Sequence, residues 1–295
     1  MGTGFYKAHG LGNDYLVFEE GDAWTATPDA VGRVCDRWRG PGGDGIVVLL
    51  ADPSSPATGY PAAPFRLRMF NPDGSEFERS GNGLRVLASY LARRGRVDTQ
   101  PFSVEVGGDL VTMTVHGSTP PVHDVSVEMG RARVGPAAVA LDPAALDPEG
   151  RLELPGGERV AVRPVSVGNP HLVVFTPEPT REQLLSWGPA LATHRALARG
   201  SNVQIAAVVD GHACRALIWE RGVGRTSASG TSSCAVAVAA VSAGLVEPGA
   251  VTVHMDGGDL SVTVSRRLDV VLRGPVEEVC EGTLTEAFVK ALPAA

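Results

Sequence analysis

Short apolar runs recur along the chain and are separated by turns rich in Gly, Pro, Asn and Asp. Such runs of branched and aromatic residues predict strands. They cover residues 15–18, 46–50, 66–70, 102–106 and 110–115, and then 161–167, 172–175, 203–206, 213–219, 251–254 and 260–264. Two segments follow a helical pattern instead: Leu84, Leu87 and Leu91 share one face, and residues 235–243 are apolar on nearly all sides. Many short strands with few helices predict an α+β fold.

The two helical segments belong to an internal repeat with an offset of 149 residues, from Ser80 to Ser229. Ser80 and Gly81 open the first helix, as Ser229 and Gly230 open the second. The first N–H groups of a helix have no partner within it and favour a negative charge. If the two halves face each other, the paired turns form a cleft suited to a carboxylate.

The length of 295 residues suits two domains of about 150 residues each. We expect a first domain over residues 1–130, completed by 275–295, and a second over 131–274. Each is predicted to be a curved, mostly antiparallel sheet wrapped around a central helix, so that the two domains are pseudo-symmetric with a ligand cleft between them. Residues 117–121 are expected to form a loop before the chain crosses to the second domain.

Composition narrows the range of partners. The net charge is −7 and offers no basic stripe for a phosphate backbone, so nucleic acid is not an expected partner. No apolar run approaches the roughly 20 residues of a membrane span, and nothing at the N-terminus directs export. The four cysteines are far apart, which favours reduced thiols in the cytoplasm and argues against a zinc site. A small molecule is the expected ligand.

Chemistry is concentrated around the two serine turns. Residues 71–85 and 219–235 are denser in polar and turn-forming residues than an ordinary link between a strand and a helix. One elaborate helix cap is common, whereas two matched caps indicate a shared site. The chain has no dinucleotide-binding glycine motif, P-loop, nucleophile elbow or His-Glu-x-x-His motif.

With these motifs the chain closely resembles the diaminopimelate epimerase family, whose members invert an amino acid without pyridoxal phosphate. The resemblance covers nearly the whole length and rests on residues 7–14, 42–45, 71–85, 168–171, 201–203, 219–235 and 274–275. It implies a cytoplasmic homodimer that acts on an amino acid of the lysine and peptidoglycan precursor pathway. It also implies that neither a metal nor an organic cofactor takes part.

Family members use two cysteines, one on each face of the substrate, as base and acid. Those positions correspond to Ser80 and Ser229, which are both serine in this chain. Two groups are needed because a proton leaves one face of the α-carbon and returns to the other. A thiol ionises readily at a helix N-terminus, whereas a hydroxyl is a much weaker acid and needs a separate base. The substitution therefore bears on the mechanism and leaves the fold and cleft intact.

The resemblance also implies the residues that bind the ammonium and carboxylate groups and supply backbone donors. These are Asn13, Asn71, Gly81, Asn82, Asn169, Asn202, Glu220, Arg221, Gly230 and Thr231. His171 either assists proton transfer or acts as a structural donor, and Cys234 is expected to pack inside a helix. Arg225 stands where the family usually has Glu, which places a cation near the second turn.

Three functional hypotheses follow from the sequence. The first is an epimerase of diaminopimelate or a closely related amino acid, with Ser80 and Ser229 as catalytic residues. The second is an isomerase or lyase of the same fold that needs a single acid or base. The third is an amino-acid-binding form impaired by replacement of both cysteines, and the sequence does not distinguish native serines from introduced ones.

Overall fold

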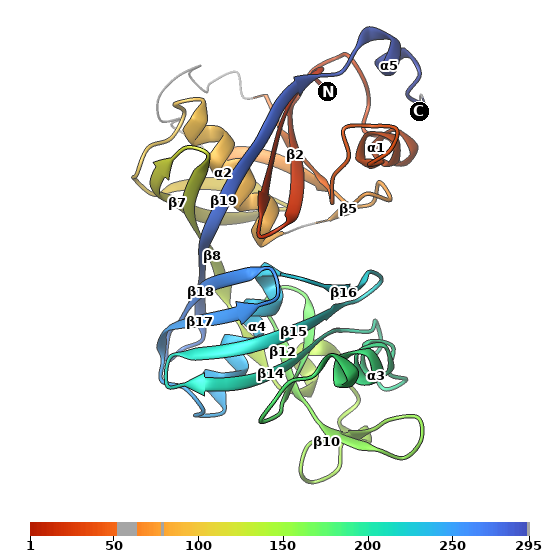
Figure 1. The fold of residues 1–295 in the computed structure, drawn as a ribbon, viewed down its shortest axis with the longest axis vertical. Coiled ribbons are helices and arrows are strands. Elements are labelled where there is room, and N and C mark those ends of the chain that lie inside the picture. Colours follow the sequence, from red (N-terminus) through yellow and green to blue (C-terminus); the bar gives the residue numbers. More distant parts are fainter. Residues whose placement is uncertain (52–63, 78–79, 294–295) are drawn as a thin grey trace. The chain divides into compact units, whose positions relative to one another are not determined.

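The structure is a computed structural model that describes residues 1–51, 64–77 and 80–293 (Figure 1). Residues 78–79, which the sequence analysis placed in the first serine motif, lie outside the described residues. The chain divides into two compact units, Met1–Glu128 with Gly274–Ala295, and Met129–Arg273. It passes from one unit to the other within β8 (Val122–Arg131) and returns within β19 (Asp269–Thr283).

The described residues of the first unit form three helices and a run of short strands. The helices are α1 (Pro28–Cys35), α2 (Gly81–Arg93) and α5 (Glu286–Lys290). The strands are β1 (Gly4–Gly10), β2 (Asn13–Glu19), β3 (Ile46–Leu49), β4 (Phe65–Phe70), β5 (Glu76–Phe77), β6 (Phe102–Val106) and β7 (Asp109–Thr119). Antiparallel pairs join β1 to β2, β3 to β4 and β6 to β7, whereas β2 with β3 and β4 with β6 are parallel.

The second unit repeats this order of pairings. Its central strands are β12 (Arg163–Ser166), β13 (Pro170–Phe175), β14 (Asn202–Asp210), β15 (Ala213–Glu220), β17 (Gly249–Met255) and β18 (Gly258–Val264). Antiparallel pairs join β12 to β13, β14 to β15 and β17 to β18, and the pairs β13 with β14 and β15 with β17 are parallel. The remaining elements are β9 (Arg133–Val134), β10 (Arg151–Glu153), β11 (Arg159–Ala161), β16 (Gly224–Thr226), α3 (Arg181–Ala192), α4 (Gly230–Ser242) and the 3-10 turns η1 (Pro136–Val139) and η2 (Pro143–Ala145).

One helix in each unit packs against several strands of its own unit. Helix α2 contacts β1, β2, β3 and β7, and α4 contacts β12, β13, β14, β15, β17 and β18. Residues 232–240 of α4 are all buried, because Ala and Val cover every side of the helix and strands meet it on several sides. The prediction of a mixed α+β fold with a buried second helix is confirmed.

The predicted strands are present, except that the run at 161–167 is divided between β11 and β12, and three long strands and three helices were missed. The strands β1, β8 and β19 contain Gly, Arg, His and Glu in place of uniform apolar runs, so their pattern is weak. The expectation of a loop at residues 117–121 is wrong, because β7 continues to Thr119 and pairs with β8 across a tight turn at Pro120 and Pro121. Helix α3 begins with a capping box of Thr180 and Gln183 that the sequence analysis overlooked.

The turn that precedes β5 is held against helix α1. Within it the Gly74 N–H donates to the Asn71 carbonyl (2.9 Å), and Gly74 has a φ of +80°. A β-carbon on Gly74 would lie 2.1 Å from the Cα of Pro28, at the start of α1.

We expect Gly74→Ala to destabilise the protein by about 3 kcal/mol, because it adds overpacking against backbone to the cost of a left-handed alanine. Gly12→Ala is the matched control: Gly12 has a φ of +88°, and its added β-carbon would meet nothing within 4 Å. Gly12→Ala should lower the free energy of unfolding by only about 1 to 2 kcal/mol. Urea unfolding of both variants measures the difference, and equal losses would contradict the contact with Pro28.

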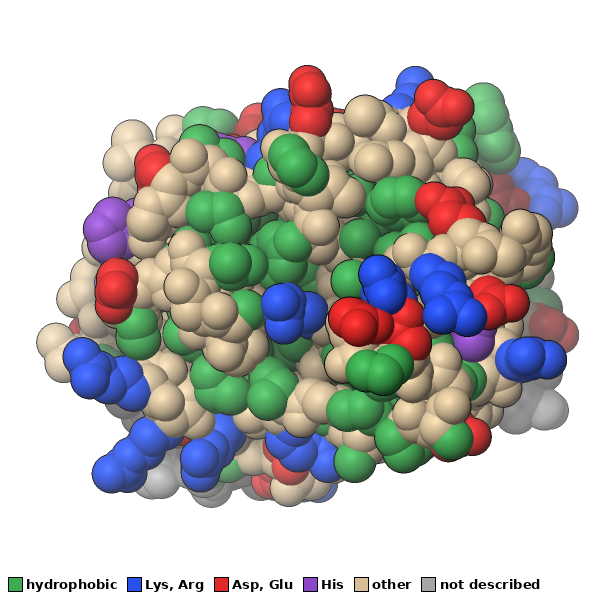
Figure 2. Space-filling model, turned by 90° about the horizontal axis from the view of Figure 1, so that it is seen from below, with side chains coloured by type: hydrophobic (Ala, Val, Ile, Leu, Met, Phe, Trp, Pro, Cys, Tyr) green, Lys and Arg blue, Asp and Glu red, His purple; other side chains and the backbone are tan. Residues whose placement is uncertain are grey.

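On the face drawn in Figure 2, the described Lys and Arg side chains are interspersed with Asp, Glu and apolar side chains. This mixture differs from the continuous basic surface by which proteins hold a phosphate backbone. Among the helices that the structure describes, none combines the length and apolar character needed to span a bilayer.

Candidate functional site

The first serine turn caps helix α2. Ser80 is the N-cap residue, and its Oγ accepts a hydrogen bond from the Gly83 N–H (3.1 Å). Gly83 is closely surrounded, since an added β-carbon would lie 2.8 Å from Met69 Cε and 3.2 Å from Tyr15 Cε1. The N–H groups of Gly81 and Asn82 belong to the first turn and have no acceptor inside the helix. The half-buried Ser80 hydroxyl therefore lies beside backbone donors and the positive end of the helix dipole.

The side chain of Asn82 is fixed by its neighbours in the first unit. Its Nδ2 donates to Asn13 Oδ1 (2.8 Å), and its Oδ1 accepts from the guanidinium of Arg85, which is fully buried. Asn13 in turn donates from Nδ2 to Asp44 Oδ2 (2.9 Å). The structure thus brings together Asn13 and Asn82, two predicted ligand-binding residues that are 69 positions apart in the sequence.

A buried carboxylate next to Asn13 is held by two cations. Asp14 accepts hydrogen bonds from Arg37 Nη1 and Nη2 (3.1 and 2.6 Å) and forms an ion pair with Lys7 Nζ (3.0 Å). Burial alone would raise the pKa of Asp14, but the hydrogen bonds from Arg37 and Lys7 outweigh it and lower that pKa. Arg37 Nη2 also donates to Asp44 Oδ1 (2.6 Å). One arginine therefore binds both Asp14 and Asp44, and Asp44 is the acid that accepts the hydrogen bond from Asn13.

Asn71 has a role within its own turn. Its Nδ2 donates to Ser75 Oγ (3.0 Å), and its backbone N–H donates to the Ser75 carbonyl (2.9 Å). The turn geometry accounts for an asparagine at this position, so the structure adds no separate sign of ligand binding there.

The second serine turn caps helix α4 in a different way. Ser229 is the N-cap residue, but its hydroxyl makes no capping hydrogen bond. Its carbonyl instead accepts from the N–H (3.0 Å) and the Oγ (2.9 Å) of Ser233. Ser229 is 6% exposed, and its hydroxyl is free of the capping contact that Ser80 makes.

A buried chain of hydrogen bonds leads to the second turn. Gln204 Nε2 contacts both Ser232 Oγ (2.9 Å) and His171 Nδ1 (3.1 Å). With Nδ1 as acceptor, His171 Nε2 carries the proton and donates to Asn169 Oδ1 (2.8 Å). The amide group of Asn169 is then directed at Thr231 Oγ1 (3.4 Å) in the first turn of α4.

His171 is 0% exposed, and this burial lowers its pKa to about 3. The nearby positive charge of Arg221 lowers this pKa further. The imidazole is therefore neutral at physiological pH, and both of its ring nitrogens are engaged in hydrogen bonds.

Asn202 and Arg221 form a second group in the same unit. Asn202 Oδ1 accepts from the Arg221 N–H (3.0 Å), and Asn202 Nδ2 donates to the Pro170 carbonyl (3.1 Å). Arg221 Nη1 donates to the Arg199 carbonyl (2.5 Å), and Glu220 is the last residue of β15. Arg225 does not add an uncompensated cation, because its Nη2 forms an ion pair with Asp256 (2.6 Å).

Two of the four cysteines are buried thiols that resist ionisation. Burial raises the pKa of Cys35 to about 12 and that of Cys214 to about 11. Cys234 is fully buried within α4, as expected for a packing residue, and Cys280 is exposed on β19. Across the described ranges, no group of three or more His, Cys, Asp or Glu is arranged to hold a metal ion.

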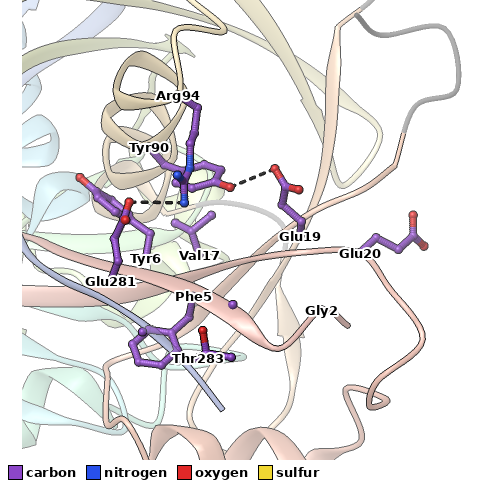
Figure 3. A pocket seen from close by; sticks show the side chains of 12 residues that line it. Gly2, Phe5, Tyr6, Val17, Glu19, Glu20, Tyr90, Arg94, Glu281 and Thr283 are labelled. Atoms are coloured by element: carbon purple, nitrogen blue, oxygen red, sulfur yellow. Dashed lines mark hydrogen bonds and ion pairs between the residues drawn. The ribbon is translucent and has the colours of Figure 1, made fainter. Parts of the chain in front are cut away.

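A hollow of about 520 Å³ in the first unit contains none of the predicted site residues (Figure 3). Two contacts link polar side chains of its lining: Tyr90 donates to Glu19 (2.9 Å), and Arg94 forms an ion pair with Glu281 (3.4 Å). The hollow therefore belongs to the charged surface beside α2 and adds no residue to the site.

Sequence reasoning missed the residues that support the predicted ones. These are Lys7, Asp14, Arg37, Asp44, Arg85, Gln204 and Ser232. Asp14 and Asp44 lie inside motifs on which the family resemblance rests. An acidic residue beside a glycine-rich turn could have indicated a role for each of them in supporting the site. Gln204 gave a weaker signal, as a single amide within an apolar strand pattern.

Three comparisons with known proteins agree. The family model described as diaminopimelate epimerase matches residues 5–135 and 164–279. A diaminopimelate epimerase of Desulforudis audaxviator is 39% identical over 289 residues, covering 96% of this chain and 99% of the relative. One of Pelotomaculum thermopropionicum is 36% identical over 286 residues, covering 94% and 97%.

Solved structures with the same fold are more distant in sequence. A predicted epimerase from Pseudomonas aeruginosa has a TM-score of 0.66 at 20% identity and covers 96% of this chain and 99% of its own. A hydroxyproline epimerase from Agrobacterium vitis, solved with bound trans-4-hydroxy-L-proline, has a TM-score of 0.66 at 15% identity, with coverages of 95% and 92%. At such identities these likenesses establish the fold.

Proposed function

Because this chain belongs to the diaminopimelate epimerase family, we propose that it interconverts the LL and meso forms of diaminopimelate, or epimerises a closely related amino acid, without a cofactor. The observation that carries the proposal is the pair of N-cap serines, Ser80 on α2 and Ser229 on α4, at the two family cysteine positions. The reaction would serve the formation of lysine and peptidoglycan precursors.

In this mechanism the alkoxide of one serine takes the α-proton, and the hydroxyl of the other serine gives its proton to the opposite face and is left as the alkoxide. No atom is gained or lost, so the net change is the configuration at one carbon. The negative charge that develops at the α-carbon and carboxylate is stabilised by N–H groups of Gly81, Asn82, Gly230 and Thr231 at the two helix N-termini. A hydroxyl is a poor base at neutral pH, so the reaction is slow compared with a thiolate mechanism.

The substrate's polar groups are held by the remaining asparagines and by Glu220 and Arg221. Support for this assignment comes from the contact of Asn13 with Asn82 and from the contact of Asn202 with Arg221, which fix these groups in each unit. Asn71 is kept in the set because the family motif includes it, although its side chain also serves its own turn.

His171 acts in this proposal as a positioning residue for Asn169. The low pKa and complete burial of the imidazole speak against its taking a proton at neutral pH. Its hydrogen bond to Asn169 Oδ1 directs the Asn169 amide toward Thr231, next to the Ser229 turn.

Domain symmetry, oligomeric state and cellular location are also assigned from membership of the family. We assign the two units to pseudo-symmetric domains that descend from one duplicated sequence, which is supported by their matching order of strand pairings and by α2 and α4 of 13 residues each. A homodimer and a cytoplasmic location complete the proposal.

The decisive experiment follows α-hydrogen exchange in deuterated water by proton NMR. With diaminopimelate, we expect slow deuterium incorporation at the α-position together with conversion between stereoisomers. Ser80→Ala and Ser229→Ala should each abolish exchange, because each removes one proton-transfer group. Ser242→Ala, at the far end of α4, is the matched control and should exchange as the parent does.

The other hypotheses predict different spectra. A new carbon skeleton or double bond would indicate a lyase or another isomerase, and binding without exchange would indicate an impaired form. If exchange persisted unchanged in both alanine variants, the assignment of the two serines would be wrong.

A further inference from the structure

Four arginines line a hollow of about 780 Å³ in the second unit, and none of the residues assigned above lines it. Arg131 and Arg133 come from β8 and β9, and Arg266 and Arg267 come from the turn between β18 and β19. No Asp or Glu lines the hollow, and within the described ranges none of the four arginines forms an ion pair with a carboxylate. This concentration of positive charge contrasts with the net charge of −7 for the chain.

The backbone holds the two arginine pairs in place. The Ala132 N–H donates to the Leu268 carbonyl (2.8 Å), and Arg131 Nε donates to the Arg267 carbonyl (2.8 Å). Leu268 has a φ of +65°, a left-handed conformation that is unfavourable for a leucine. Surrounding contacts must sustain that conformation, and the hydrogen bond from Ala132 is one of them.

The turn that carries Arg266 and Arg267 is closed by its own acid. Asp269 Oδ2 accepts from Ser265 Oγ (2.8 Å), and the Asp269 N–H donates to the same hydroxyl (3.0 Å). Asp269 is thus committed to the turn. Since Arg131 uses Nε for the Arg267 carbonyl, its two terminal nitrogens carry the donors that remain for a ligand.

The other lining residues are apolar: Ala132, Val134, Ala137, Ala138 and Leu268. The hollow thus combines a charged part with an apolar part, and its volume lies within the roughly 300 to 1,000 Å³ of small-molecule sites. A guanidinium group binds phosphate oxygens through two parallel hydrogen bonds. A ligand with a single carboxylate would engage fewer of the four guanidinium groups than a ligand with several phosphates.

From this arrangement we propose that the arginine hollow binds a small diphosphate or triphosphate ester, with the phosphates on the four guanidinium groups and the organic part against the alanines and Val134. A nucleoside diphosphate has this chemistry. Four like charges brought together repel one another, and a polyanion relieves that repulsion on binding.

Isothermal titration calorimetry of the full chain at low salt, without divalent cations, tests the proposal with ADP, pyrophosphate and adenosine. We expect ADP to bind most tightly, pyrophosphate several-fold more weakly, and adenosine not measurably. Arg131→Gln with Arg267→Gln should weaken ADP binding by at least about tenfold, because two charge-assisted contacts are lost. Arg133→Gln with Arg266→Gln, which leaves the hydrogen bond between Arg131 and Arg267 in place, should also weaken it.

Arg181→Gln is the matched control, an exposed arginine at the start of α3 that should bind ADP as the parent does. An absence of heat with both ADP and pyrophosphate would overturn the proposal. So would full affinity in both double variants, or an equal loss in Arg181→Gln. Equal affinity for ADP and pyrophosphate would overturn the role given to the apolar side.

Discussion

Replacing Ser80 and Ser229 together by cysteine is expected to raise the epimerase activity by roughly 10²- to 10⁴-fold, the range that a well-placed general acid or base contributes. A free thiol has a pKa near 8.5 that falls at a helix N-terminus, and both positions are N-caps. The hydroxyl that the thiol replaces is a far weaker acid. The measurement is kcat with LL-diaminopimelate, followed by the appearance of the meso form.

Each single cysteine variant places a thiol on only one face of the substrate. Each should gain less than the pair, because one weak proton-transfer group remains. Ser242→Cys places a thiol at the opposite end of α4 and should leave the activity unchanged. A folded double variant no more active than its parent would show that contacts elsewhere, such as the ion pair of Arg225 with Asp256, have redirected substrate choice.

Acid should destabilise the protein through His171 at pH values where most carboxylates are still ionised. Burial lowers the pKa of His171 to about 3, whereas in the unfolded chain it lies near 6.5. Between these values the unfolded state binds the extra proton, so stability falls as the pH falls below about 6.5. At about 1.4 kcal/mol per pH unit, this residue accounts for a loss of up to about 3 kcal/mol between pH 6 and pH 4.

Urea unfolding at several pH values compares the parent with His171→Gln, whose side chain does not titrate. The variant should be less stable at pH 7, since it disturbs the contacts with Gln204 and Asn169, but its stability should change less between pH 6 and pH 4. His212→Gln, at an exposed histidine, should follow the parent. Parallel curves for the parent and His171→Gln would contradict the neutral, buried state of His171.

Between pH 6 and pH 4, the contribution of His171 to stability changes far more than that of Asp14 does. Because the pKa of Asp14 is lowered in the folded state, its contribution is present above its unfolded pKa of about 3.9 and is lost only as the pH falls toward the folded value. Asp14 therefore does not contribute to a loss of stability that begins near pH 6.

Local pattern was sufficient for the central part of the fold. The predicted runs at 46–50 and 251–254, which lie in β3 and β17, follow from side-chain periodicity. The helices that begin at Gly81 and Gly230 follow from periodicity and turn chemistry, which act over a few neighbouring residues. Strands β1, β8 and β19 were missed because their stability comes from pairing with distant strands, as β1 pairs with β19 from the opposite end of the chain.

The sequence by itself determined the family, the mixed α+β fold and the two N-cap serines, because each depends on motif order or on local backbone preference. Only the tertiary structure decided how the side chains around those serines are engaged. The contact of Asn82 with Asn13, the clamp of Arg37 on Asp14 and the neutral state of His171 all arise from burial and from partners far away in the chain. Burial and long-range pairing belong to the packed molecule, since no local pattern specifies which distant polar group will lie within hydrogen-bonding distance.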